Sequence, residues 1–123
     1  MTKRLIALTA LTLVGCTSPV ERVTKMWNEG GHSSTEFTDV GEKVRGGKCS
    51  AGTVAGMSAT ICEFASAEEA GKAQESGWEL LGGAVGSSVA AGKILLVIAD
   101  PKKEDPSGRR LNELINSFRK NMP

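Results

Sequence analysis

Cysteine and histidine are the side chains in this chain best suited to redox, nucleophilic or metal chemistry. The chain has three Cys and one His. Cys49 and Cys62 lie too far apart for the Cys-x-x-Cys motif that lowers a thiol pKa in redox enzymes. His32 lies in the Gly- and Ser-rich stretch NEGGHSS, away from any metal-ligand spacing. We therefore expect no metal, no cofactor and no catalytic activity. Thiol redox or metal binding by Cys49 and Cys62, with His32, stays open as an alternative.

The Gly-Lys pair at 92–93 resembles part of a phosphate-binding loop. That loop needs G-x-x-x-x-G-K-[ST] between a strand and a helix. Here five residues separate Gly86 from Gly92, and Ile94 occupies the Ser/Thr position. An apolar run typical of a strand follows, so the spacing favours a hairpin turn over a nucleotide site.

A loop of mixed charge, ADPKKEDPSG, joins the last apolar run to the last amphipathic segment. Loops carry function more often than cores do. Lys102 and Lys103 lie in this loop, and Arg109 and Arg110 follow it directly. We expect these four side chains to form an interaction surface for an acidic partner or an anion. The alternative is a solvated connection to a well-capped helix.

The N-terminus has the features of an export signal. Lys3 and Arg4 precede ten uncharged, mostly apolar residues, 5–14. That run is too short to cross a bilayer, which needs roughly 20 residues, but it suits the apolar region of a signal peptide. It ends in Leu13-Val14-Gly15-Cys16, which resembles the lipobox of bacterial lipoproteins.

The lipobox resemblance implies a lipid anchor at Cys16. In that family the Cys thiol carries diacylglycerol, the chain is cut before the Cys, and the new amine is acylated. Two or more acyl chains hold a protein stably at a bilayer. The residue after the Cys is Thr17 rather than Asp, which by resemblance favours the outer membrane, with the domain facing the periplasm.

The mature chain would be small and nearly neutral. Removing residues 1–15 from 123 leaves 108 residues, with 13 Lys and Arg against 14 Asp and Glu because Lys3 and Arg4 are lost. A net charge of −1 excludes the basic field that nucleic-acid binding needs. Aromatic residues are scarce and Tyr is absent. A thin core of this kind gains from a covalent staple.

Cys49 and Cys62 can supply that staple. An exported chain meets an oxidising compartment, where a pair of cysteines favours a disulfide. The segment KCSAGTVAGMSATICEF has two β-prone halves around Ala55-Gly56. Cys49 lies six residues before Ala55, and Cys62 lies six residues after Gly56. A hairpin centred on this turn places the cysteines opposite each other, at roughly 4.5–5.5 Å between Cβ atoms.

Three helices and a second hairpin complete the predicted fold. The spacing of Phe37, Val40 and Val44 predicts a helix from Ser34 to Gly46. A capping box, Ser66 to Glu69, predicts a second helix that ends at Gly82-Gly83. Its narrow face consists of Ala70, Ala73, Gly77 and Leu81. Asp105-Pro106 is expected to open the last helix. The core face of that helix consists of Leu111, Leu114, Ile115 and Phe118.

The second hairpin is expected to turn at Ala91-Gly92 and to pair Val85 with Ile98. The run Ile94 to Ala99 is suited to a central strand. Ala91-Gly92 follows Ala55-Gly56 by 36 positions, as Gly82-Gly83 follows Gly46-Gly47, which suggests a weak 36-residue repeat.

These elements predict an α+β fold in the order α-ββ-α-ββ-α. Its sheet has four mainly antiparallel strands in two hairpins, with helices on one face. Residues 1–15 are the expected signal, 16–34 the lipidated Cys and a flexible tether, and 35–123 the domain. Within the tether, VERVTKMW is amphipathic, and would lie on the lipid surface or dock on the domain.

The mature domain also resembles small bacterial lipoproteins that have no assigned activity. The shared pieces are a Cys-containing hairpin, an apolar strand and a helix that begins D-P-S-G. In this chain they are Lys48–Phe64, Ile94–Asp100 and Asp105–Gly108. We expect an anchored, non-catalytic binding module with an envelope protein as partner. A small ligand held against the Gly/Ala-rich hairpin is a weaker alternative.

Overall fold

The computed structural model describes residues 18–122 and shows an α+β fold. The predicted signal and Cys16 lie outside the described residues. The elements in chain order are α2 (Pro19–Glu29), β1 (Thr38–Gly41), β2 (Lys48–Val54), β3 (Met57–Glu63), α3 (Ala67–Lys72), α4 (Gln74–Leu80), β4 (Gly86–Ala91), β5 (Ile94–Ala99) and α5 (Arg109–Asn121). The strands form one antiparallel sheet in the order β1-β2-β3-β5-β4.

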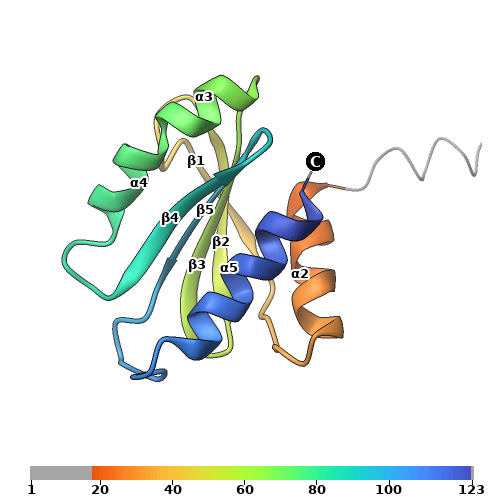
Figure 1. Cartoon of the computed structure of the whole chain (residues 1–123). Coiled ribbons are helices and arrows are strands. Elements are labelled where there is room, and N and C mark those ends of the chain that lie inside the picture. Colours follow the sequence, from red (N-terminus) through yellow and green to blue (C-terminus); the bar gives the residue numbers. More distant parts are fainter. Residues whose placement is uncertain (1–17, 123) are drawn as a thin grey trace, which may run out of the picture.

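The sheet carries helices on both faces, not on one as predicted (Figure 1). The strand β5 has alternating side chains that serve two cores: Leu96 and Ile98 belong to the core under α2 and α5, whereas Leu95 and Val97 belong to the core under α3 and α4. All four side chains are buried. The continuous apolar run of β5 is the sequence signature of a strand covered on both sides.

The sheet has a fifth strand, β1, where the sequence predicted a helix over 34–46. Phe37 and Val44 pack into the two different cores, so their helix-like spacing does not mark one face. Val40 is exposed. The Thr35 N–H donates to the Thr53 carbonyl at 2.9 Å, which starts the pairing of this segment with β2. The Phe37 ring lies over Gly52, where a Cβ atom would meet it at 2.6 Å.

The first hairpin has the predicted register. Cys49 lies opposite Cys62, and Val54 lies opposite Met57 across the Ala55-Gly56 turn. Ala55 and Gly56 have φ values of 52° and 81°. Two positive φ angles match the twist of a tight hairpin.

The second hairpin turns one residue later than predicted, at Gly92-Lys93. Ala91 pairs with Ile94, so Ser87 rather than Val85 lies opposite Ile98. Gly92 has a positive φ of 57° at the first central position of the turn. A turn at Ala91-Gly92 would instead require Ala91 to take the left-handed conformation at that position. The two turns are therefore not 36 residues apart, and the predicted repeat does not hold.

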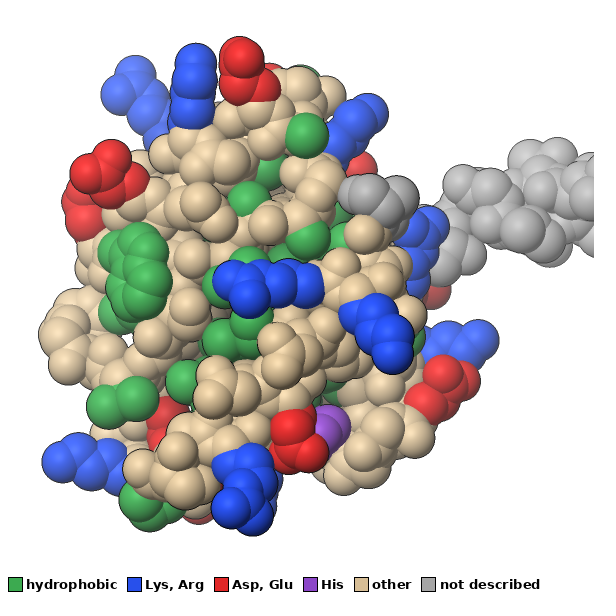
Figure 2. Space-filling view, in the orientation of Figure 1, with side chains coloured by type: hydrophobic (Ala, Val, Ile, Leu, Met, Phe, Trp, Pro, Cys, Tyr) green, Lys and Arg blue, Asp and Glu red, His purple; other side chains and the backbone are tan. Residues whose placement is uncertain are grey.

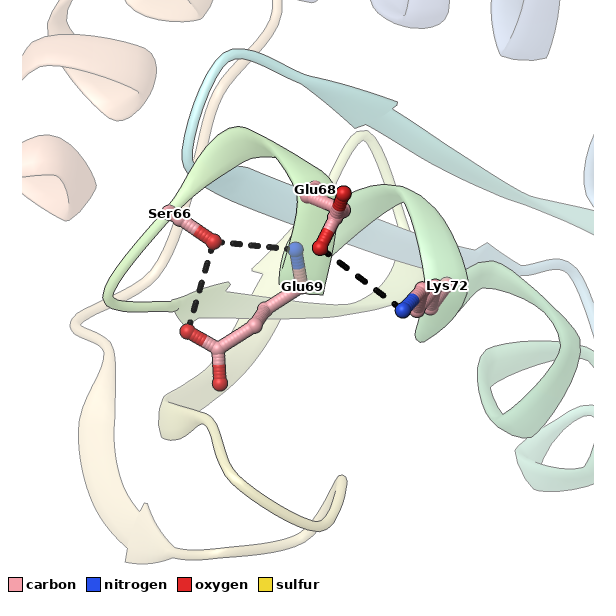
Figure 3. A network of polar contacts seen from close by, with 4 residues as sticks. All are labelled: Ser66, Glu68, Glu69 and Lys72. Carbon is pink, nitrogen blue, oxygen red and sulfur yellow. Dashed lines mark hydrogen bonds and ion pairs between the residues drawn. The ribbon is translucent and has the colours of Figure 1, made fainter.

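Ser66 caps the predicted helix, but its contact with the Glu69 carboxylate runs through its hydroxyl and not through its backbone N–H, so the reciprocal half of the predicted capping box differs (Figure 3). The Glu69 N–H donates to Ser66 Oγ at 3.2 Å, and Ser66 Oγ donates to Glu69 Oε2 at 3.3 Å. Lys72 forms an ion pair with Glu68 one turn apart, at 3.7 Å. The helix is interrupted at Ala73, which divides it into α3 and α4.

The small-residue face of α3 and α4 lies against the sheet as predicted. Ala70, Ala73, Gly77 and Leu81 are buried. A Cβ on Gly77 would lie 2.8 Å from Val97 Cγ2, so only glycine allows this approach.

The segment 19–34 is not a flexible tether. Its first part is the helix α2, capped by Ser18, whose Oγ accepts from the Glu21 N–H at 3.1 Å. Val23 and Trp27 are fully buried against the sheet. Trp27 Nε1–H donates to the Leu114 carbonyl at 3.2 Å, which ties α2 to α5. Of the alternatives for VERVTKMW, docking on the domain is the one the structure shows.

The last helix begins at Arg109, four residues after the predicted Asp105. Asp105 still serves as a cap, because its Oδ2 accepts from the Leu111 N–H at 2.9 Å. The predicted core face, Leu111, Leu114, Ile115 and Phe118, is buried. Among the helices of residues 18–122, none has the length and apolarity that crossing a membrane requires.

Candidate interaction surface and buried disulfide

The charged loop 100–108 is organised by one buried carboxylate. Asp100 is only 3% exposed. Its Oδ1 accepts from the Glu104 N–H and its Oδ2 from the Asp105 N–H, both at 2.8 Å. The Asp100 N–H donates to the Val85 carbonyl at 2.7 Å, which fixes the start of the loop to the chain that enters β4. Hydrogen bonds from backbone N–H groups to a carboxylate are among the strongest in a protein.

The end of the loop is fastened to α5. Asp105 Oδ2 accepts from the Leu111 N–H, and Ser107 Oγ lies 3.3 Å from both Asp105 Oδ1 and the Arg109 N–H. Gly108 is the N-cap residue, with a φ of 73° and no side-chain cap. The two ends of the loop are therefore set by polar contacts rather than by apolar packing.

The structure brings the four predicted cations to this end of the domain. Lys102 and Lys103 project from the loop and Arg109 and Arg110 from the first turn of α5, and all four are exposed. We call these four residues the basic surface. Within residues 18–122 the one ion pair is Lys72–Glu68, so none of the four is salt-bridged to a described carboxylate. Figure 2, which views the α5 side, shows Lys and Arg side chains spread over it with acidic ones between them.

The position of Arg109 and Arg110 is electrostatically unfavourable for the helix. The N-terminus of a helix carries partial positive charge and favours acidic side chains. The first turn of α5 has none, whereas the last turn carries Arg119 and Lys120. Asp105, whose Oδ2 accepts from the Leu111 N–H, supplies negative charge at this end of the helix, and the two exposed arginines add positive charge beside it.

The acidic side chains gather on the opposite layer. In α3 and α4, four glutamates accompany the single Lys72: Glu68, Glu69, Glu75 and Glu79. The loop and α5 carry an excess of cations, although Glu104, Asp105 and Glu113 lie among them. The domain therefore presents charge of opposite sign on its two helical layers.

Cys49 and Cys62 form a disulfide across β2 and β3. Their Cα atoms are 4.0 Å apart, and the side chains are 1% and 0% exposed in the core under α3 and α4. Thiol–disulfide exchange requires an attacking thiolate to reach a sulfur atom. This burial favours a structural bridge over a working redox pair.

His32 is not close to the cysteines. It follows α2, and its N–H donates to the Trp27 carbonyl at 2.8 Å. Ser34 bridges to Val54 at one end of β2, whereas Cys49 lies near the other end, about 16 Å away at 3.3 Å per residue. Among the described residues, no group of three His, Cys, Asp or Glu side chains is placed to hold a metal ion.

Gly92-Lys93 is a hairpin turn, as the sequence favoured. The segment before it is the strand β4 and the segment after it is the strand β5, so no helix begins directly after the turn as a phosphate-binding loop requires.

Sequence reasoning missed two features of this molecule. One is the role of Asp100, because an Asp-Pro pair after a strand carries no pattern that predicts a buried acceptor for the next backbone N–H groups. The second is a groove beside Pro19, which exists only because α2 docks. The spacing of Val23 and Trp27 carried the signal for that docking.

Comparison with known proteins gives no relative, since no family model, curated protein or solved structure matches the chain.

Proposed function

We propose that this protein is an envelope lipoprotein, anchored through Cys16 in the outer membrane and facing the periplasm, whose disulfide-stapled domain is a non-catalytic binding module. Its partner is an acidic envelope protein, and the basic surface is the binding site. The observation that supports this most is a loop held by a buried Asp100, which together with the first turn of α5 presents four cations that have no salt bridge to a carboxylate within residues 18–122.

The geometry suits a binding surface because the loop is ordered before a partner arrives. A surface that is already in its bound shape loses little conformational entropy on association. Arg supplies a planar group that pairs with a carboxylate through two hydrogen bonds, and Arg109 and Arg110 are adjacent. Charge complementarity of this kind sets partner choice and association rate.

The position of the surface also fits an anchored protein. α2 begins at Pro19, close to Cys16 in the chain, and Met122, the residue after α5, lies near the same end of the sheet. The basic surface lies at the other end of α5, which is 13 residues or about 20 Å long. In Figure 1 the loop before α5 and the C-terminus lie at opposite ends of the domain. The proposed site therefore points away from the anchor.

Carbodiimide crosslinking in intact cells tests this function. The reagent joins lysine amines to carboxylates in direct contact, so Lys102 or Lys103 is expected to appear linked to an Asp or Glu of one partner protein. Arg109→Glu combined with Arg110→Glu should abolish this product. Lys25→Glu combined with Lys43→Glu makes the same charge change at exposed sites elsewhere and should leave it intact. Identical products from all three proteins would refute the proposal.

A further inference from the structure

A groove lies at the end of the domain where α2 begins, and α2 begins three residues after Cys16 in the chain. Its volume is about 470 Å³, and it is lined by the start of α2, the start of α3, the β4–β5 turn and the residue after α5. The apolar lining residues are Pro19, Ala67, Ile94 and Met122. We call this space the α2–α5 groove. Ile94 and Met122 are largely buried, at 6% and 8% exposure, and the groove is bounded on its inner side by these two apolar side chains.

The groove is held close to the anchoring residue. Cys16 precedes Pro19 by three residues, and an extended chain spans at most about 3.6 Å per residue, or about 11 Å in all. Pro19 is held in position because α2 packs against the sheet through the buried Val23 and is hydrogen-bonded to α5 through Trp27 and Leu114. A Cys16 whose acyl chains enter a bilayer therefore brings this groove to the lipid surface.

The charges around the groove fit lipid phosphates. Arg22 and Lys93 line it, and both side chains are exposed. Arg119 and Lys120 lie in the last turn of α5, next to Met122. One carboxylate, Glu63, lines the groove as well.

Three further carboxylates near this end contact neighbouring side chains. Glu21 Oε1 lies 3.4 Å from Ser18 Oγ, and Glu69 Oε2 lies 3.3 Å from Ser66 Oγ. Glu68 pairs with Lys72. Cationic side chains beside an apolar groove match the order of phosphate and acyl chain in a phospholipid.

We propose that the α2–α5 groove seats an acyl chain of a bilayer phospholipid while Arg22 and Lys93 contact its phosphate. The domain then rests on the membrane through the start of α2, the β4–β5 turn and the end of α5. This inference rests on the lipid anchor at Cys16 proposed above. With the groove on the membrane, the domain would have one orientation relative to the bilayer, unlike a domain on a flexible tether.

Photolabelling from the bilayer tests the proposal. The lipidated protein is purified from membranes and reconstituted into vesicles of phosphatidylethanolamine and phosphatidylglycerol. The vesicles contain a trace of phosphatidylcholine with a diazirine on one acyl chain. After illumination, peptide mapping should find the lipid adduct on Pro19–Arg22, on Lys93–Ile94 and near Met122. Labelling that is absent from both Lys93–Ile94 and Met122, or spread equally over Lys102–Arg110, would overturn it.

A matched pair of variants tests the role of the cations. Arg22→Glu should reduce groove labelling several-fold, because it places a carboxylate where the phosphate lies. Lys25→Glu reverses a charge three residues along the same helix, outside the groove, and should label like the native protein. Equal labelling of the two variants would refute the phosphate contact.

The intact mass of the same preparation separates this inference from the proposed anchor. A Cys16 without acyl groups refutes both. An acylated Cys16 with unlabelled groove peptides refutes the inference alone and leaves the anchor in place.

Discussion

Replacing Asp100 by Asn should destabilise the protein far more than its small change in shape suggests. The carboxylate accepts two backbone N–H groups with different oxygens, and the side chain is 3% exposed. An amide keeps one acceptor and turns an NH₂ group toward the other N–H. One hydrogen bond to a charged group is lost, at about 1.5–3 kcal/mol, and a partly buried backbone N–H is left facing another donor. We expect Asp100→Asn to lower the free energy of unfolding by about 2–4 kcal/mol.

The control for this prediction is Asp39→Asn. Asp39 is exposed, and its Oδ1 accepts a single bond from the Gly41 N–H at 2.8 Å. An amide oxygen can still accept that bond, so the expected loss is below about 0.5 kcal/mol, as for most surface substitutions.

Urea unfolding followed by far-UV circular dichroism, with the purified protein in a nonionic detergent, measures both variants. Equal slopes against urea are needed for the midpoints to report stability. Hydrogen exchange at the Glu104 and Asp105 amides gives a local readout, and both should exchange faster in Asp100→Asn. If the two variants unfold within about 0.5 kcal/mol of each other, Asp100 does not organise the loop.

Three further predictions concern the staple, the core and the docking of α2. Reducing the Cys49–Cys62 bridge should lower stability by about 2–3 kcal/mol, the chain-entropy value for a loop of this size, and a melting curve unchanged by reductant would contradict it. Leu114→Ala should lower the free energy of unfolding by about 2–5 kcal/mol, because Leu114 is fully buried. Asn116→Ala, on the exposed side of α5, should lower it little, and comparable urea midpoints for the two variants would mean that α5 is not docked. Trp27→Phe keeps an aromatic ring but removes the hydrogen bond to the Leu114 carbonyl, so it should lower the free energy of unfolding by about 1–2 kcal/mol. It should also increase amide hydrogen exchange in α2, and unaltered exchange there would argue against the α2–α5 contact.

Local chemistry in this chain was predictable where one short segment determines the outcome. The Ser66 cap depends on residues three apart, and the Cys49–Cys62 pairing depends on one turn at Ala55-Gly56. The small face of α3 and α4 likewise follows from residue size. In each case the interacting groups are close in the sequence or are related by symmetry about a single turn.

The sequence predictions were wrong where a residue far away in the sequence determines whether a segment forms a helix or a strand, or whether it packs into the core. Phe37 and Val44 have helical spacing, but β2 offers a free edge and Gly52 leaves space for the Phe37 ring, so the segment becomes β1. Val23 and Trp27 become core residues because Leu114 and the sheet are there to receive them. Helices cover both faces of the sheet because the apolar residues of β5 alternate between two cores. The sequence predicts β5 as a central strand, but a continuous apolar run also predicts cover on both faces.

The docking of α2 changes what an anchored domain of this kind can do. A domain on a long flexible tether samples many orientations, and its partner must select one of them. Here at most a few residues separate Cys16 from a helix that is buried against the sheet and hydrogen-bonded to α5. Under the anchor proposed above, the fold sets the orientation of the domain, and α5 spans about 20 Å from the end where α2 begins to the basic surface. A periplasmic partner would then meet the four cations at a fixed height and angle above the membrane, because the helix that follows the proposed anchor is part of the core.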